Sequence, residues 1–186
     1  TDPPNIDILC RLIKGPQFQE AAITELSKLA EKGEDSNAVE ALVKVSSDAD
    51  LSNLLPSILE HLSNPSLLKD HILLIDSILN RKMSTIDTSL ITSNLAKNIS
   101  MFSIEDINEI MKALSNILIR TDQKISKDDL NLIFNNCQNN ECLLKVIEFI
   151  FTEKKSLAST DSYPIVKDLI DKSSTSLPLF PILKHF

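Results

Sequence analysis

Apolar residues recur every three or four positions along most of the chain, and polar residues fill the places between them. This spacing puts one apolar stripe on each of a series of short helices. No stretch of useful length alternates with the period of two that a half-buried strand requires. We therefore predict an all-α fold of about ten short helices, over residues 5–14, 17–32, 36–43, 50–62, 65–79, 87–99, 103–119, 127–136, 140–154 and 162–172.

The residues of the apolar stripes are expected to form the core. The predicted inward-facing residues are Ile6, Leu9, Ile13, Phe18, Ala22, Leu26, Leu29, Val39, Leu42, Val43, Leu51, Leu54, Leu55, Ile58, Leu59, Leu62, Leu68, Ile72, Ile75, Leu79, Leu90, Ile91, Leu95, Ile107, Met111, Leu114, Leu118, Cys142, Val146, Phe149 and Ile150. The expected helix boundaries carry recognisable caps. Ser103 with Asp106 and Ser126 with Asp129 have the spacing of N-terminal caps, and Gly33 stands where a C-terminal cap belongs.

Pro56 stands inside the leucine-rich stretch "LSNLLPSILEHL" (51–62) and allows two interpretations. A proline in a regular helix interior costs about 3 kcal/mol. Six large apolar residues flank it, and the burial of each contributes roughly 1.5–3 kcal/mol. The comparison favours one kinked helix through Pro56. The alternative is a short turn over residues 50–54 followed by a helix over 55–63 with Pro56 in its first turn.

Four helical segments overlay roughly, which indicates a repeated unit. They are residues 18–32, 67–81, 107–121 and 141–155, and their starts are 49, 40 and 34 residues apart. Residues 51–79 resemble a segment of the HEAT/armadillo superfamily, in which an inner helix "LLPxILxxL" is followed by a short polar turn. The matching positions are Leu54, Leu55, Pro56, Ile58, Leu59 and Leu62, then Asn64 and Pro65. Residues 20–35, "EAAITELSKLAEKGED", are similar to an outer helix of such a repeat that ends in a Gly-acidic turn.

The resemblance covers about residues 18–80 and weakens beyond them. It implies a right-handed α-α superhelix, an α-solenoid, whose concave face binds another protein and which has no catalytic residues. We expect a single helical-repeat domain over residues 1–186, with the serine-rich stretch 156–162 as the one candidate linker.

Charge and composition narrow the choice of partner. The net charge is −7, and residues 1–93 carry 14 acids and 8 bases, whereas residues 94–186 carry 12 acids and 11 bases. No basic stripe is visible, there is no Trp and there is one Tyr, so the balance counts against nucleic acid. Acidic runs at 31–35 and 46–50 are either solvated turns or an edge that attracts a basic partner.

The residues capable of chemistry are few and poorly grouped. His61, His71 and His185 lack further ligands at zinc spacing, so we interpret them as structural histidines. Cys137 and Cys142 have a spacing that would suit a local disulfide or a metal with outside help. Their places at a helix end and on an apolar stripe favour small buried apolar residues instead. With Cys10 they make an odd, sparse set, which predicts a reducing, intracellular setting.

Paired carboxylates and sequence motifs give no sign of an enzyme. The pairs Glu34–Asp35, Glu105–Asp106 and Asp128–Asp129 fall at expected helix ends, where the helix dipole accounts for the last two. No phosphate-binding loop, Gly-rich dinucleotide turn, HExxH or EF-hand loop is present, and we predict no catalytic, metal or cofactor site.

We therefore expect a non-enzymatic module that binds a basic or amphipathic protein segment, without a membrane span or signal peptide. The exposed candidates are Glu60, Lys69, Asp76, Arg81 and Lys82. The alternative is a nucleic-acid-binding helical repeat that uses the less acidic second half, with Lys97, Lys112, Lys124, Lys127 and Lys145. The chain does not begin with Met, and we expect it to be a piece of a longer protein.

Overall fold

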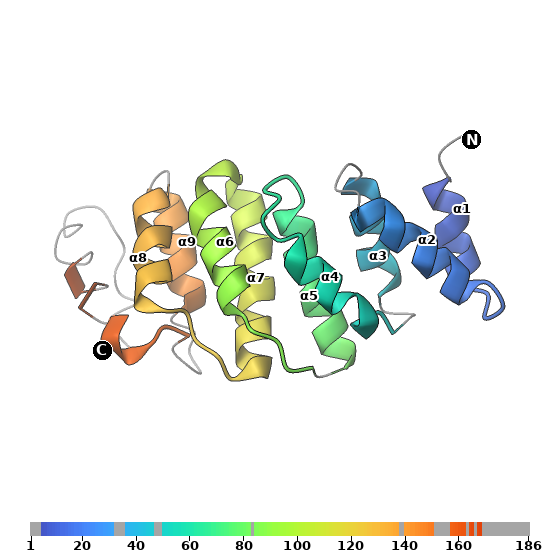
Figure 1. The fold of residues 1–186 in the computed structure, drawn as a ribbon. Coiled ribbons are helices and arrows are strands. Elements are labelled where there is room, and N and C mark those ends of the chain that lie inside the picture. The colour runs from blue at the N-terminus through green and yellow to red at the C-terminus, as the bar shows by residue number, and fades with distance from the viewer. Residues whose placement is uncertain are drawn as a thin grey trace. The chain divides into compact units, whose positions relative to one another are not determined.

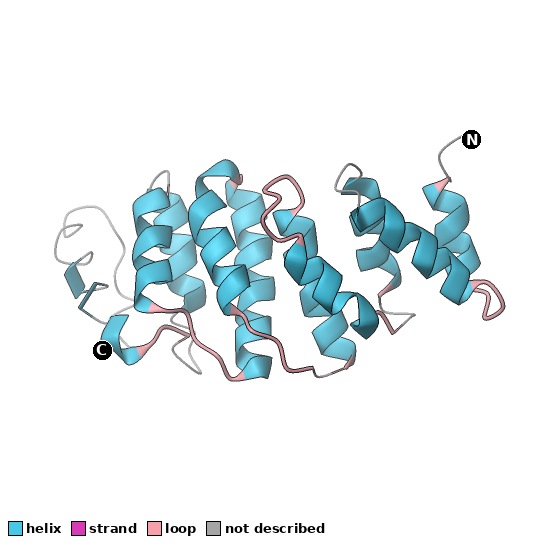
Figure 2. Ribbon diagram, viewed as in Figure 1, coloured by secondary structure: helices cyan, strands magenta, loops and turns pink. Residues whose placement is uncertain are grey.

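The computed structural model describes residues 5–31, 36–46, 50–82, 84–137, 140–150, 157–162, 164, 165, 167 and 168. Over these residues the fold is all-α, as predicted, and no strand is present (Figure 2). Contacts divide the chain into two compact units, Thr1–Thr85 and Ile86–Phe186. The single domain expected over residues 1–186 stays a prediction. None of the described helices is both long enough and apolar enough to cross a bilayer.

The first unit contains five α-helices and one short 3-10 turn in its described part (Figure 1). Helix α1 contacts both α2 and α3, α2 also contacts α3, and α5 packs against α3 and α4. The core is built from the predicted stripes, and Leu26, Leu42, Leu62 and Leu68 are fully buried. The helices are α1 (Ile6–Ile13), α2 (Gln19–Glu31), α3 (Ser36–Val45), η1 (Ser52–Leu54), α4 (Leu55–Glu60) and α5 (Leu68–Arg81).

Four α-helices in the described part of the second unit form two layers. Helix α6 packs against α8 and α7 packs against α9, so each helix contacts the one two places along the chain (Figure 1). Ile91, Leu95, Leu114, Ile133 and Val146 are fully buried between them. The elements are α6 (Ser89–Asn98), η2 (Ile99–Met101), α7 (Ile104–Thr121), α8 (Lys127–Asn136), α9 (Asn140–Ile150) and η3 (Thr160–Ser162).

The helix caps of the second unit follow the sequence closely. Ser103 and Asp106 form a complete capping box: the Ser103 Oγ accepts from the Asp106 N–H, and the Asp106 carboxylate accepts from the Ser103 N–H. The Ser126 Oγ likewise accepts from the Asp129 N–H at 3.1 Å. The proposed Gly33 cap lies outside the described residues.

The kinked helix that we predicted through Pro56 is wrong, and the alternative is confirmed. Residues 52–54 form the 3-10 turn η1, and α4 begins at Leu55, so Pro56 lies in its first turn. There the missing N–H is not needed, because the Ser52 carbonyl already accepts from the Leu55 N–H. Leu55, Ile58 and Leu62 are buried as expected. A kinked helix and a helix that begins at Leu55 would bury the same side chains, so apolar burial does not distinguish the two interpretations.

Two predicted core residues are exposed. Phe18 is 53% exposed because α2 begins only at Gln19, which leaves Phe18 in the preceding turn. Leu90 is 48% exposed because the buried face of α6 is formed by Ile91, Thr92, Leu95 and Ala96. Ile6, Leu29, Val43, Leu54, Leu59 and Phe149 are half-buried.

Of the serine-rich stretch 156–162 the structure describes residues 157–162, and these do not form an exposed linker. Leu157, Ala158 and Ser162 are buried, and Ala158 pairs with Ile125 in the loop before α8. The Ile125 N–H donates to the Leu157 carbonyl at 2.8 Å, and the Ser159 N–H donates to the Ile125 carbonyl at 3.1 Å. These backbone bonds hold residues 157–159 against the loop before α8. The prediction of a linker relied on serine content alone, which gives no information about these bonds.

Polar side chains join segments that lie one helix pair apart in the second unit. The Gln123 Oε1 accepts from the Thr88 N–H at 2.9 Å and from its hydroxyl at 2.6 Å, while the Nε2 donates to the Ile86 carbonyl at 2.5 Å. The Thr92 hydroxyl donates to the Asp129 carboxylate at 2.7 Å, and the Asn136 amide donates to the Ala96 carbonyl at 2.8 Å.

Replacing Pro56 with Ala tests its place in the first turn of α4. Removal of a proline from a regular helix interior would stabilise the helix by about 3 kcal/mol. At a first-turn position no bond is missing, so we expect P56A to lower the free energy of unfolding by about 0.5–1 kcal/mol, because Ala leaves the unfolded chain more freedom. Urea unfolding measures the difference, and a stabilisation of about 2 kcal/mol or more would contradict the observed helix start.

Replacing Gln123 with Ala removes three hydrogen bonds and leaves buried groups of residues 86–88 unpaired. We expect the free energy of unfolding to fall by about 2–4 kcal/mol, measured by urea unfolding. Gln123→Glu keeps the acceptor for Thr88, so its free energy of unfolding should lie between the values of wild type and Q123A. Lys124→Ala, at the exposed neighbouring position, is the control and should change it by less than about 0.5 kcal/mol. Equal effects of Q123A and K124A would show that these bonds do not hold the loop.

Candidate functional site

The described part of the first unit contains a small pocket between α2, α3, η1, α4 and α5. Its volume is about 20 Å³, which is enough for one water molecule. Most of its lining is apolar, and four polar side chains contribute to it: Ser27, Ser57, His61 and His71. The apolar lining residues are Ala30, Val39, Leu42, Leu54, Ile58 and Leu74.

His71 is the unusual residue of this pocket. It is 3% exposed, and its Nδ1 has no hydrogen-bond partner among the described residues. Burial first, and the neighbouring His61 second, lower the pKa of His71 to about 4, so the ring is neutral at pH 7. A sequence signal for this burial exists, because His71 follows Leu68 by three positions and precedes Ile75 by four, on the predicted stripe of α5.

His61 stands at the end of α4 and is half-buried. Its Nδ1 lies 2.8 Å from the Ser57 carbonyl oxygen. A carbonyl only accepts, so the Nδ1 carries the proton and donates, and the Nε2 is an acceptor in the neutral ring. The structure thus brings together the two histidines that the sequence placed near one break between helices.

The histidines do not have the ligand set of a metal centre. In the described ranges no three His, Cys, Asp or Glu side chains lie close enough together to hold a metal ion. A structural zinc site needs four ligands, and a catalytic one takes three from the protein. His185 lies outside the described residues. The pocket with His61 and His71 is a packed junction of helices with room for one water.

Cys137 and Cys142 are also brought together. Cys137 follows the last residue of α8 and is half-buried, while Cys142 is the third residue of α9 and is 1% exposed. The neighbouring Cys142 thiol and burial raise the pKa of Cys137 well above its usual range. Cys142 is thus a small buried residue as predicted, and Cys137 is its sulfur neighbour.

The two carboxylate pairs that the structure describes lie at helix starts. Asp106 closes the capping box of α7, and Glu105 is exposed beside it. Asp129 accepts from Thr92, and Asp128 is exposed in the first turn of α8. The pair 34–35 lies outside the described residues. These contacts give the carboxylates structural roles at helix starts.

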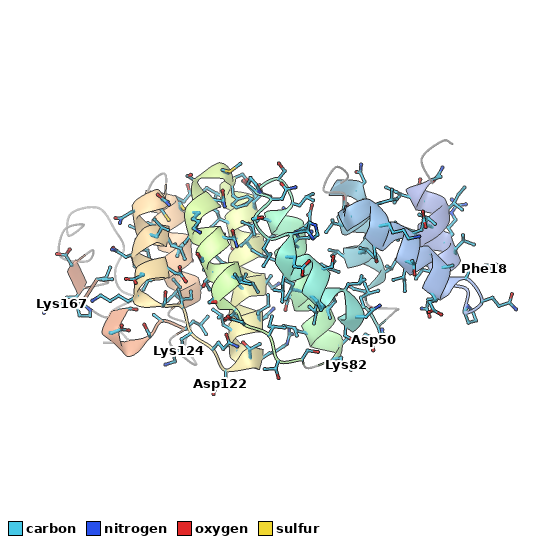
Figure 3. All side chains as sticks on the ribbon, viewed as in Figure 1. Phe18, Asp50, Lys82, Asp122, Lys124 and Lys167 are labelled. Carbon is cyan, nitrogen blue, oxygen red and sulfur yellow. The ribbon has the colours of Figure 1, made fainter. Side chains whose placement is uncertain are left out.

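Of the acidic runs 31–35 and 46–50, the structure describes little beyond Asp50. Its pKa is lowered to about 2, first by hydrogen bonds from Ser52 and then by Lys82. The Asp50 carboxylate lies 3.4 Å from the Lys82 Nζ, and both side chains are exposed (Figure 3). Of the other candidate contact residues, Glu60 and Arg81 are exposed, while Lys69 and Asp76 are half-buried.

The five lysines proposed for nucleic acid do not gather on one face. Lys97 is in the last turn of α6, and Lys127 is the first residue of α8. The contacts of Thr92 with Asp129 and of Ala96 with Asn136 show that α6 and α8 run parallel, so these two lysines stand at opposite ends of the layer. Lys112 belongs to the other layer, and Lys145 pairs with Glu148 at 3.0 Å. Lys124 is in a loop (Figure 3).

Comparison of the chain with models of known protein families, with curated proteins and with solved structures finds no match. The HEAT/armadillo resemblance therefore stays a prediction that rests on the residues quoted for it.

Replacing His71 with Leu tests the neutral buried ring. The pKa of His71 is about 4 in the folded state and about 6.5 when unfolded, so the unfolded chain binds the proton first as the pH falls. Between pH 6.5 and pH 4, this one group should remove about 3 kcal/mol from the free energy of unfolding. In urea unfolding, the free energy of unfolding of wild type should therefore fall by about 3 kcal/mol more than that of H71L between pH 6.5 and pH 4. His61→Gln should keep most of the extra loss, because His61 is only the second cause of the low pKa of His71 after burial. An H71L curve parallel to wild type would contradict the assignment.

Proposed function

We propose that the chain is a non-enzymatic helical-repeat module, HEAT- or armadillo-like in construction, that binds a protein or peptide segment inside the cell. The observation that carries the proposal is the packing of α6 on α8 and of α7 on α9. Consecutive helix pairs that stack in this way are the building plan of α-solenoids, which use extended surfaces for binding.

The polar contacts of the second unit support a repeated construction. Five hydrogen bonds join four residue pairs that are 35, 37, 37 and 40 residues apart: Gln123 with Thr88, Asp129 with Thr92, Gln123 with Ile86, and Asn136 with Ala96. The sequence overlay gave 40 and 34 residues between the later repeat starts. Separations of this size match one repeat of two helices, which HEAT and armadillo units also have.

The layer formed by α6 and α8 offers the surface that we assign to the partner. Leu90 of α6 and Leu132 of α8 are exposed by 48% and 36%, with Lys97, Asp128 and the Asn131 side chain also exposed on this layer. Apolar side chains among polar ones suit an amphipathic segment of another protein. The exposed side chains of these two helices are one repeat apart, so one extended partner would contact both.

The matched test uses affinity capture with the full chain and two variants. Wild type should retain a protein partner after nuclease treatment, and L90E/L132E should weaken its binding at least about tenfold, because each change places a charge in an apolar contact. Ile119→Glu is the control, since Ile119 is exposed by 46% on α7 in the other layer.

Three results would contradict the proposal. Capture of RNA without protein, with affinity that falls steeply as salt rises, would support the nucleic-acid alternative instead. Loss of the partner with I119E but not with L90E/L132E would exclude the α6–α8 layer. Equal binding by all three proteins would exclude both exposed surfaces. Circular dichroism of each variant confirms that the helices are retained.

A further inference from the structure

Two hydrogen bonds fix how far α8 lies along α6. The Thr92 hydroxyl donates to the Asp129 carboxylate, 37 residues later in the chain, and the Asn136 amide donates to the Ala96 carbonyl, 40 residues earlier. A residue of α6 therefore lies beside the residue of α8 that is 37 to 40 positions later. Because the two helices run parallel, this relation gives the level of each exposed side chain along the layer.

The exposed side chains of both helices form one outer face of the layer. On α6, Leu90 and Lys97 are exposed and lie seven positions apart, close to two helical turns. On α8, Asp128 and Leu132 are exposed and lie four positions apart, close to one turn. The opposite sides of the two helices are buried in the core of the second unit and include Ile91, Leu95, Leu130 and Ile133.

Opposite charges stand at the two ends of this outer face. Asp128 is level with Leu90 at the end where α6 and α8 begin, and Asp87, which precedes α6, is also exposed at that end. Lys97 is exposed in the last turn of α6, about 10 Å farther along. Leu132 lies between these two levels. The outer face thus runs from an acidic end, past two leucines, to a basic end.

Other charged side chains near the acidic end do not cancel it. Lys127 comes two positions before Asp129, about 200° round the helix. Asp129 contacts α6, so Lys127 points to the side of α8 that is away from α6. Asp122 and Lys124, in the loop before α8, have opposite charges and add no net charge.

We propose that the partner of this outer face is an amphipathic α-helix that lies antiparallel to α6 and α8, with an acidic side chain beside Lys97 and a basic side chain beside Asp128. This inference rests on the proposed function, because it names the partner of the same surface. A helix is about 10 Å across, and packed helices lie about 8–10 Å apart, so one helix laid over α6 and α8 contacts both.

The levels of the side chains define the sequence pattern of the partner helix. Leu132 is about one turn from Lys97, and Leu90 with Asp128 is about two turns from it. The matching helix has an acid at position i, large apolar residues at i+3, i+4 and i+7, and a base at i+8. In the antiparallel orientation the acid lies toward the N-terminus of the partner and the base toward its C-terminus, where the helix dipole favours each charge.

The test measures the binding of two synthetic peptides to the full chain by fluorescence anisotropy. The first peptide follows this pattern with Glu at i, Leu at i+3, i+4 and i+7, and Arg at i+8. The second exchanges the Glu and the Arg. Both carry a hydrocarbon link on the opposite side, because so short a helix is marginal alone. Wild type should bind the first peptide about five- to tenfold more tightly, because the second meets like charges at both ends.

Charge exchange on the protein should reverse this preference. K97E/D128K should bind the second peptide more tightly than the first, and about 0.5 M salt should reduce both preferences, because the contacts are exposed. Lys112→Glu is the matched control, since Lys112 is exposed on α7 in the other layer, and it should leave the preference unchanged. L90E/L132E should weaken the binding of both peptides at least about tenfold.

Equal binding of the two peptides by wild type would overturn the proposal, and so would a preference that K97E/D128K leaves unchanged. If affinity capture retains a protein that L90E/L132E loses, while neither peptide binds, the proposed function stands and the helical partner is excluded. Failure of both capture and peptide binding excludes both. Circular dichroism of each variant establishes that it is folded before the titration.

Discussion

Most of the described helices are too short to persist alone, and burial of each apolar stripe against a neighbouring helix is the constraint on which the structure depends. Helix α4 has six residues and α8 has ten, whereas isolated helices shorter than about 12–15 residues are marginal in water. Helix α7, with 18 residues, is the longest of the described helices and buries eight of them. The shorter helices are stabilised by packing against neighbouring helices. In the second unit this packing joins alternate helices, because α6 packs on α8 and α7 packs on α9.

Apolar burial is non-directional, so it does not by itself fix how far one helix slides along the next. In the second unit directional bonds do this: Thr92 to Asp129 sets one end of α6 against α8, and Ala96 to Asn136 sets the other. Gln123 then holds the segment that enters α6 to the segment that leaves α7. Asn136 also satisfies a carbonyl in the last turn of α6, where such groups lack helical partners. Asn136 thus pairs a carbonyl at the end of α6 and also helps to fix the register of α6 against α8.

The sequence predicted what depends on local chemistry and missed what depends on the neighbours of a residue. The stripe of α5 and the caps at Ser103 and Ser126 follow from spacing and residue type, and all were confirmed. Pro56 was misjudged because burial is equal for a kinked helix and for a helix that starts at Leu55, so only the backbone bond of Ser52 distinguishes them. The partners of Gln123 lie 35 and 37 residues away, and no local pattern announces them.

Several of the described side chains that could take part in chemistry have structural roles instead. The ring of His71 is buried and neutral, Asp106 closes a cap, and Asp129 ties two helices. Groups so engaged are poor candidates for catalysis, because a catalytic residue must be free to exchange protons or bonds with a substrate. The exposed side chains of α6 and α8, such as Leu90 and Leu132, are not engaged in this way. If the proposed repeat construction holds, an extended partner would contact both helices, and this is the physical reason to seek function along the layer before seeking it in the pocket.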